Sequence, residues 1–96
     1  MNLSARYRRR ERIVERSIAG ESFLIPVCGT PVEMENIFVL NELGAFIWRR
    51  LDGGSTLSGI IDAIQEQYEV TRAEAESDLG GLIERMLAAG LIEETA

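Results

Sequence analysis

Histidine, lysine and cysteine, which often carry catalysis or bind metals, are scarce or absent in this chain of 96 residues. It contains no histidine and no lysine, so all ten of its basic residues are arginines. The chain therefore lacks the commonest general base, the commonest metal ligand and any Schiff-base amine. Cys28 is the only cysteine, which excludes an internal disulfide, and no histidine is present to activate it as a nucleophile. These features predict a protein that is not an enzyme and that binds no cofactor and no metal.

The stretch from Asn36 to Val39 offers another kind of chemistry, which is hydrogen bonding by the main chain. It ends the third of three β-rich runs, and the last strand of such a meander is an edge unless something covers it. An edge strand presents unpaired N–H and C=O groups, to which a guest peptide can add as a further strand. We therefore predict that a peptide binds along this strand. The predicted residues are Asn36, Ile37, Phe38 and Val39.

Both faces of this strand become apolar towards its end. Phe38 and Leu40 alternate with Ile37 and Val39, so one pair covers the core and the other offers apolar surface to something else. The alternative is that Ile37 and Val39 only contact the third helix or a second copy of the chain.

The third predicted helix provides a second candidate surface. Gly80 and Gly81 lie in its middle, where each glycine costs up to about 1 kcal/mol relative to alanine. On a helical wheel Gly80 shares one flank of the apolar arc with Glu76, Ile83 and Leu87. The missing side chain at Gly80 predicts a trough that a peptide side chain can fill, so these four residues are further predicted peptide contacts. The alternative is close helix–strand packing, or a position that tolerates glycine.

The chain that must position these surfaces divides into two halves of different periodicity. Residues 12–41 have the pattern of three short strands, with Gly20 in the first turn and Gly29 and Pro31 in the second. Residues 42–92 have the pattern of three helices. We predict an α+β fold, a winged helix-turn-helix in which a three-stranded antiparallel sheet is followed by three helices.

Local signals mark the ends of the helices. Asn41 is suited to cap a helix over residues 42–51, which Asp52-Gly53-Gly54 would end. Ser55 or Thr56 starts the second helix. Thr71 and Glu74 form a capping box for a third helix over residues 72–89, and Gly90 follows it as the residue after the C-cap.

Charge is distributed unevenly along the chain. Residues 1–16 hold six arginines against two glutamates, whereas the rest holds four arginines against fourteen acidic residues. We predict a flexible basic N-terminal arm over residues 1–11 and a domain over residues 12–96. The arm is suited to an acidic partner or to nucleic acid, and the alternative is a solvated, frayed terminus.

The third helix argues against nucleic acid, because its excess of acidic residues would be repelled by phosphate. The charged residues of the helix are Glu74, Glu76, Asp78 and Glu84 against Arg72 and Arg85.

No apolar run is long enough to span a membrane, and no signal-peptide core is present, so we predict a cytoplasmic protein without membrane contact.

Over roughly residues 33–93 the chain resembles the PqqD-like family, the RiPP recognition elements. The resemblance begins with an apolar strand that leads into a helix containing a small residue and a tryptophan. It continues through Leu-Asp-Gly and a helix led by threonine to a closing Gly-Leu-Ile. The matching residues are Leu40, Asn41, Gly44, Ile47, Trp48, Leu51, Asp52, Gly53, Leu82, Leu87, Gly90, Leu91 and Ile92.

The resemblance implies a winged helix-turn-helix that performs no chemistry. Such proteins bind the leader of a ribosomally made precursor peptide and present it to a modifying enzyme, commonly a radical SAM enzyme. In the family the leader adds as a strand beside the third strand, in a groove shared with the third helix. That site corresponds to residues 36–39 and to the flank of Gly80 in this chain.

Two other functions are compatible with the sequence. One is a winged-helix transcriptional regulator that uses its wing and its arginine-rich terminus. The other is a plain dimerisation module, a homodimer in which the third strand pairs with its own copy.

Overall fold

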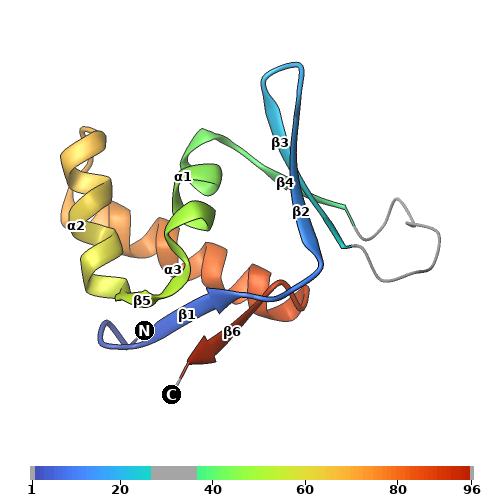
Figure 1. Ribbon diagram of the computed structural model, residues 1–96. Coiled ribbons are helices and arrows are strands. Elements are labelled where there is room, and N and C mark those ends of the chain that lie inside the picture. Colours follow the sequence, from blue (N-terminus) through green and yellow to red (C-terminus); the bar gives the residue numbers. More distant parts are fainter. Residues whose placement is uncertain (1, 27–36, 96) are drawn as a thin grey trace.

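A computed structural model describes residues 2–26 and 37–95 of the chain. These residues form an α+β arrangement of antiparallel strands and three helices, as the sequence predicted (Figure 1). The strands lie in two three-stranded sheets, ordered β2-β3-β4 and β5-β1-β6. The elements are β1 Arg6–Arg9, β2 Ile13–Ile18, β3 Glu21–Pro26, β4 Phe38–Leu40, α1 Glu42–Arg50, β5 Asp52–Thr56, α2 Leu57–Gln67, α3 Arg72–Ala88 and β6 Ile92–Thr95.

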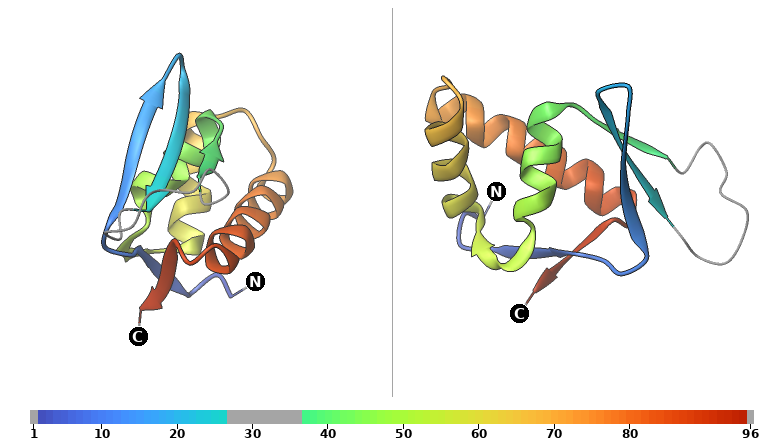
Figure 2. Two further views of the ribbon diagram at one scale, coloured as in Figure 1. Left: turned by 90° about the vertical axis from the view of Figure 1, so that its right-hand side faces the viewer. Right: turned by 45° about the horizontal axis from the view of Figure 1, so that its top comes forward.

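The β2–β4 sheet is the meander that the sequence predicted. β2 and β3 form a hairpin through Ala19 and Gly20, which both have positive φ angles, of 53° and 83°. Two consecutive residues of this kind are typical of the type I′ turn, whose twist matches that of the strands. β4 then pairs with β3, so that Phe38 lies opposite Leu24 and Val39 opposite Phe23. In the left view of Figure 2 the sheet stands at one side of the helices, with β4 as the strand nearest to α3.

The helices begin at the predicted caps. The Asn41 side chain accepts a hydrogen bond from the Gly44 N–H at 2.7 Å, and Thr71 accepts one from the Glu74 N–H at 3.1 Å. Thr56, one of the two candidates for the second helix, caps α2. Each cap satisfies a backbone donor that the helix itself leaves unpaired. Gly90, with a φ angle of 73°, follows α3 as predicted.

The core lies between the three helices and the inner face of the β2–β4 sheet. It includes the single tryptophan, Trp48, and Leu24 from the sheet. The largest fully buried side chains are Leu24, Ile47, Leu51, Leu57, Ile60, Ile61, Ile64, Leu79, Met86 and Leu91.

The N-terminal segment differs from the prediction. Residues 6–9, expected within a flexible arm, form β1 at the centre of the second sheet. β1 pairs with β6 over its whole length and with β5, which the sequence indicated only as a helix-ending turn. Arg6–Arg9 shows no alternation of apolar residues, so its strand character comes from partners far along the chain. That residues 12–96 form a domain separate from residues 1–11 stays a prediction.

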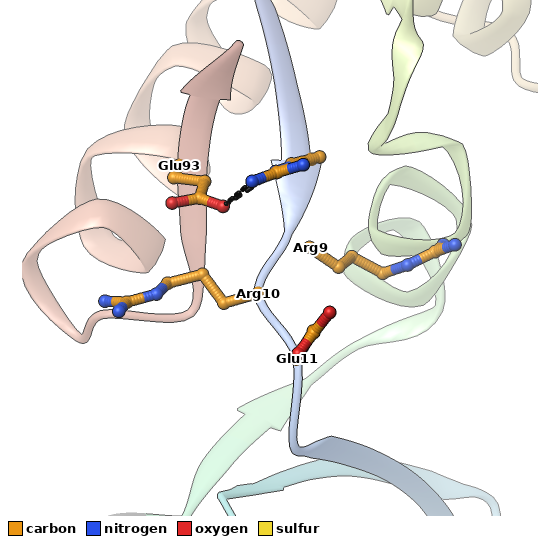
Figure 3. A pocket seen from close by; sticks show the side chains of 5 residues that line it. Arg9, Arg10, Glu11 and Glu93 are labelled. Atoms are coloured by element: carbon orange, nitrogen blue, oxygen red, sulfur yellow. Dashed lines mark hydrogen bonds and ion pairs between the residues drawn. The ribbon is translucent and has the colours of Figure 1, made fainter.

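The arginines of this segment make contacts inside the molecule. The Arg9 guanidinium donates hydrogen bonds to the carbonyl oxygens of Trp48, at 3.0 Å, and Arg49, at 2.9 Å. These carbonyls lie at the C-terminal end of α1, where the helix dipole favours a cation. Arg8 forms an ion pair with Glu93 at 2.6 Å. Figure 3 shows Arg9 and Arg10 pointing to opposite sides of the chain, Arg9 towards α1 and Arg10 towards α3.

Gly81 allows a test of whether a glycine within α3 lowers the stability of the protein. A Cβ atom placed there would meet nothing within 4 Å, so Gly81→Ala should raise the free energy of unfolding by about 0.5–1 kcal/mol. Gly44→Ala is the matched control, because its Cβ would lie 3.1 Å from both the Asn41 carboxamide oxygen and Leu40. Urea denaturation should show a gain for Gly81→Ala and none for Gly44→Ala. Equal effects would contradict this account of the two glycines.

Candidate functional site

The free edge of the β2–β4 sheet is the first part of the candidate site. β4 pairs with β3 on one side, and no other described strand pairs with it. In antiparallel sheets alternate residues direct both N–H and C=O towards the same neighbour, so an edge strand keeps unpaired groups. Ile37, Phe38 and Val39 lie at this edge as predicted, whereas Asn36 lies outside the described residues.

A groove between β4 and α3 is the second part of the site. One hollow, of about 260 Å³, has β4 residues on one side and α3 residues on the other. A smaller one, of about 170 Å³, continues between α1 and α3 and shares four of its residues. We call the two together the β4–α3 groove. Its lining residues are Val39, Leu40, Asn41, Leu43, Gly44, Ile47, Asp78, Leu82 and Arg85.

The groove combines apolar walls with two charges. Leu40 and Leu82 are almost fully buried, at 2% and 5% exposure. The Arg85 guanidinium lies 5.9 Å from the centre of the Phe38 ring, and no described carboxylate comes within ion-pair distance of it. Asp78 is seven residues earlier on the same helix, about 10 Å away along its axis. The groove is therefore suited to hold an extended chain between apolar walls, with a cation that can attract an acidic group.

The structure places the predicted helix flank elsewhere. Glu76 and Gly80 line a separate shallow hollow with other α3 residues, and they line neither hollow of the β4–α3 groove. Ile83 is buried in the core, whereas Leu87 is 41% exposed. The predicted trough beside Gly80 is therefore not part of the groove next to β4. That these four residues contact a peptide stays a prediction.

The helical period explains this difference. At 100° per residue, Glu76 and Gly80 follow one margin of the buried stripe of α3, and Asp78 and Arg85 follow the other. The wheel presents both margins without showing which of them β4 approaches. The prediction followed Gly80 on the first margin and considered Arg85 only as a charge that would face nucleic acid.

Together, the fold and the site define a small α+β domain with an open strand edge beside a helix-lined groove. The family model for coenzyme PQQ synthesis protein D (PqqD) matches residues 30–92, and the chain belongs to this family. This confirms the resemblance drawn from the sequence.

A comparison with solved structures places the chain beside a known protein. Among solved structures it is similar to TbiB1 in complex with the TbiA(beta) leader peptide, with 29% sequence identity and a TM-score of 0.72. The similarity covers 93% of this chain and 98% of the other. No curated protein sequence matches the chain.

Within residues 2–26 and 37–95, no helix has the length and apolar character needed to cross a membrane.

Proposed function

We propose that the protein is a non-catalytic adaptor that binds the leader of a ribosomally made precursor peptide by strand addition at β4. The observation that carries the proposal is the open β4 edge beside the β4–α3 groove. Membership of the PqqD family supports a peptide-binding role, as does the similarity to TbiB1, which was solved with a leader peptide. Ile37, Phe38 and Val39 would provide the edge, and Leu82 and Arg85 the opposite wall.

In strand addition the backbone of β4 would provide affinity for the guest main chain, and the groove would select the guest side chains. Hydrogen bonds from the edge of β4 hold the guest main chain whatever its sequence. Guest side chains on the inner face then enter the groove, where Leu40 and Leu82 favour an apolar residue and Arg85 favours an acidic one. Such a complex should have a dissociation constant of about 1 μM or lower, or about −8 kcal/mol.

We propose further that the bound leader is presented to a modifying enzyme, of the radical SAM class, in the cytoplasm where such precursors are made. In this interpretation α1–α3 and the β2–β4 sheet form a winged helix-turn-helix that serves as a peptide platform. The acidic residues along α3 and the engagement of Arg8 and Arg9 inside the molecule favour this role over nucleic-acid binding.

Selection from a displayed library of random peptides, each long enough to span β4, tests the proposed function. We expect enrichment of peptides that bind the purified full chain with dissociation constants of about 1 μM or below, measured by calorimetry on synthetic copies. The enriched sequences should lack proline and glycine, because the guest must form a strand. If no peptide is enriched over a blank surface, the proposed function is wrong.

A further inference from the structure

The outer face of the β2–β4 sheet, turned away from the core, is mainly apolar, although Arg16 also lies on it. Leu24 and Phe38 point inwards and are buried or packed against the core, so their neighbours in sequence point outwards. Ile18 is 61% exposed and Val39 57% exposed on that face. A hollow of about 360 Å³ lies there, and every described residue that lines it is apolar. The lining residues are Ile18, Phe23, Ile25, Ile37 and Val39.

This outer hollow adjoins the proposed binding edge, because Ile37 and Val39 belong to the edge segment itself. A strand that adds to β4 must place every second side chain on the outer face. Directly opposite residues of neighbouring strands have Cβ atoms about 4.5–5.5 Å apart, within contact of each other. A guest residue opposite Val39 would therefore lie against the outer hollow without any movement of the sheet.

We propose that the guest peptide is recognised on both of its faces. Inner side chains enter the β4–α3 groove, and an outer aliphatic or aromatic side chain packs against Val39 and Ile37 at the outer hollow. This inference rests on the strand addition proposed above, and it defines the guest more closely. The preferred peptide has apolar residues at adjacent positions, so that one faces inwards and the other outwards.

A second copy of the chain fits this face less well. Arg16 lies opposite Phe23 in the sheet register and therefore on the same face. Face-to-face pairing would bury this cation, and each copy carries a net charge of −6. A guest strand beside β4 lies three strand spacings from β2, about 14 Å, and leaves Arg16 in water.

The experiment compares Val39→Thr with Val14→Thr, using a synthetic peptide selected from the displayed library as the probe. Both substitutions keep a β-branched side chain of the same shape on the same face, but Val14 lies on β2, remote from the guest. We expect Val39→Thr to raise the dissociation constant about threefold and Val14→Thr to leave it unchanged. Val39 also borders the β4–α3 groove, so the position dependence decides which face is recognised. Serine substitution along the peptide should weaken binding at both inner and outer positions, and only the outer effect should shrink in Val39→Thr.

The outcomes separate this inference from the function on which it rests. If no peptide binds at all, the proposed function fails and the inference fails with it. If peptides bind but serine weakens binding only at every second position, or if the two valine variants behave alike, recognition on the outer face is overturned while strand addition stands. A dimer in sedimentation velocity that Val39→Thr dissociates would also overturn the inference, because a second copy would then occupy this face.

Discussion

Methylation of alternate backbone nitrogens in a bound peptide should weaken its binding strongly, whereas methylation of the intervening nitrogens should leave affinity nearly unchanged. A strand added to β4 directs every second N–H to the protein and the others to solvent. Each methyl group on an inward nitrogen removes one hydrogen bond and leaves a partner on β4 unpaired, at about 1–3 kcal/mol. Two such groups should therefore raise the dissociation constant about 100-fold, measured by fluorescence anisotropy on labelled peptides.

The control for this prediction is built into the peptide. Methylation restricts the peptide backbone in both sets of positions, so the alternation itself reports the hydrogen bonds to β4. Equal losses at all positions would indicate an effect on the free peptide, and equal tolerance would indicate recognition by side chains alone. Either result would contradict strand addition at residues 37–40.

Removal of residues 2–11 should destabilise the protein severely. β1 joins β5 to β6, so its loss leaves both of these strands without their partner. Ala5 is buried, Leu3 and Tyr7 pack against the core, and each large apolar side chain contributes about 1.5–3 kcal/mol when fully buried. Loss of these contacts and of the Arg9 bonds to α1 should remove much of the stability of about 5–15 kcal/mol typical of a domain. Urea denaturation followed by circular dichroism should show a lost or strongly shifted transition.

Arg8→Gln is the control for the truncation. It removes the Arg8–Glu93 ion pair, whose side chains are largely exposed, and should change the free energy of unfolding by less than about 1 kcal/mol. A truncated chain that unfolds at the same urea concentration as the full chain would support the flexible arm predicted from the sequence.

The elements that the sequence predicted correctly are those specified by neighbouring residues. Asn41, Thr71 and Gly90 mark helix ends because a cap needs only residues three or four positions away. The alternation of Phe38 and Val39 likewise predicted that they lie on opposite faces of the strand, one towards the core and one away from it, and the structure shows this for β4. Local patterns therefore predicted the meander and the helices.

The second sheet depends on contacts that no local pattern shows. Arg6 pairs with Thr56 and with Thr95, fifty and more residues away. Four residues with three arginines resemble a solvated terminus until those partners are in place. Leu82 and Arg85 were not among the predicted site residues for a similar reason, since only the packed fold shows that they line the groove next to β4.

The most direct test of strand addition at β4 is an amide NMR titration of the isotope-labelled full chain with a selected peptide. The account predicts that the amides of residues 37–40 shift most, together with those of Leu82 and Arg85, and that the amides at the edge of β4 gain protection from hydrogen exchange. Shifts confined to other surfaces, such as the segment around Arg10 or the hollow beside Gly80, with β4 unchanged, would contradict it.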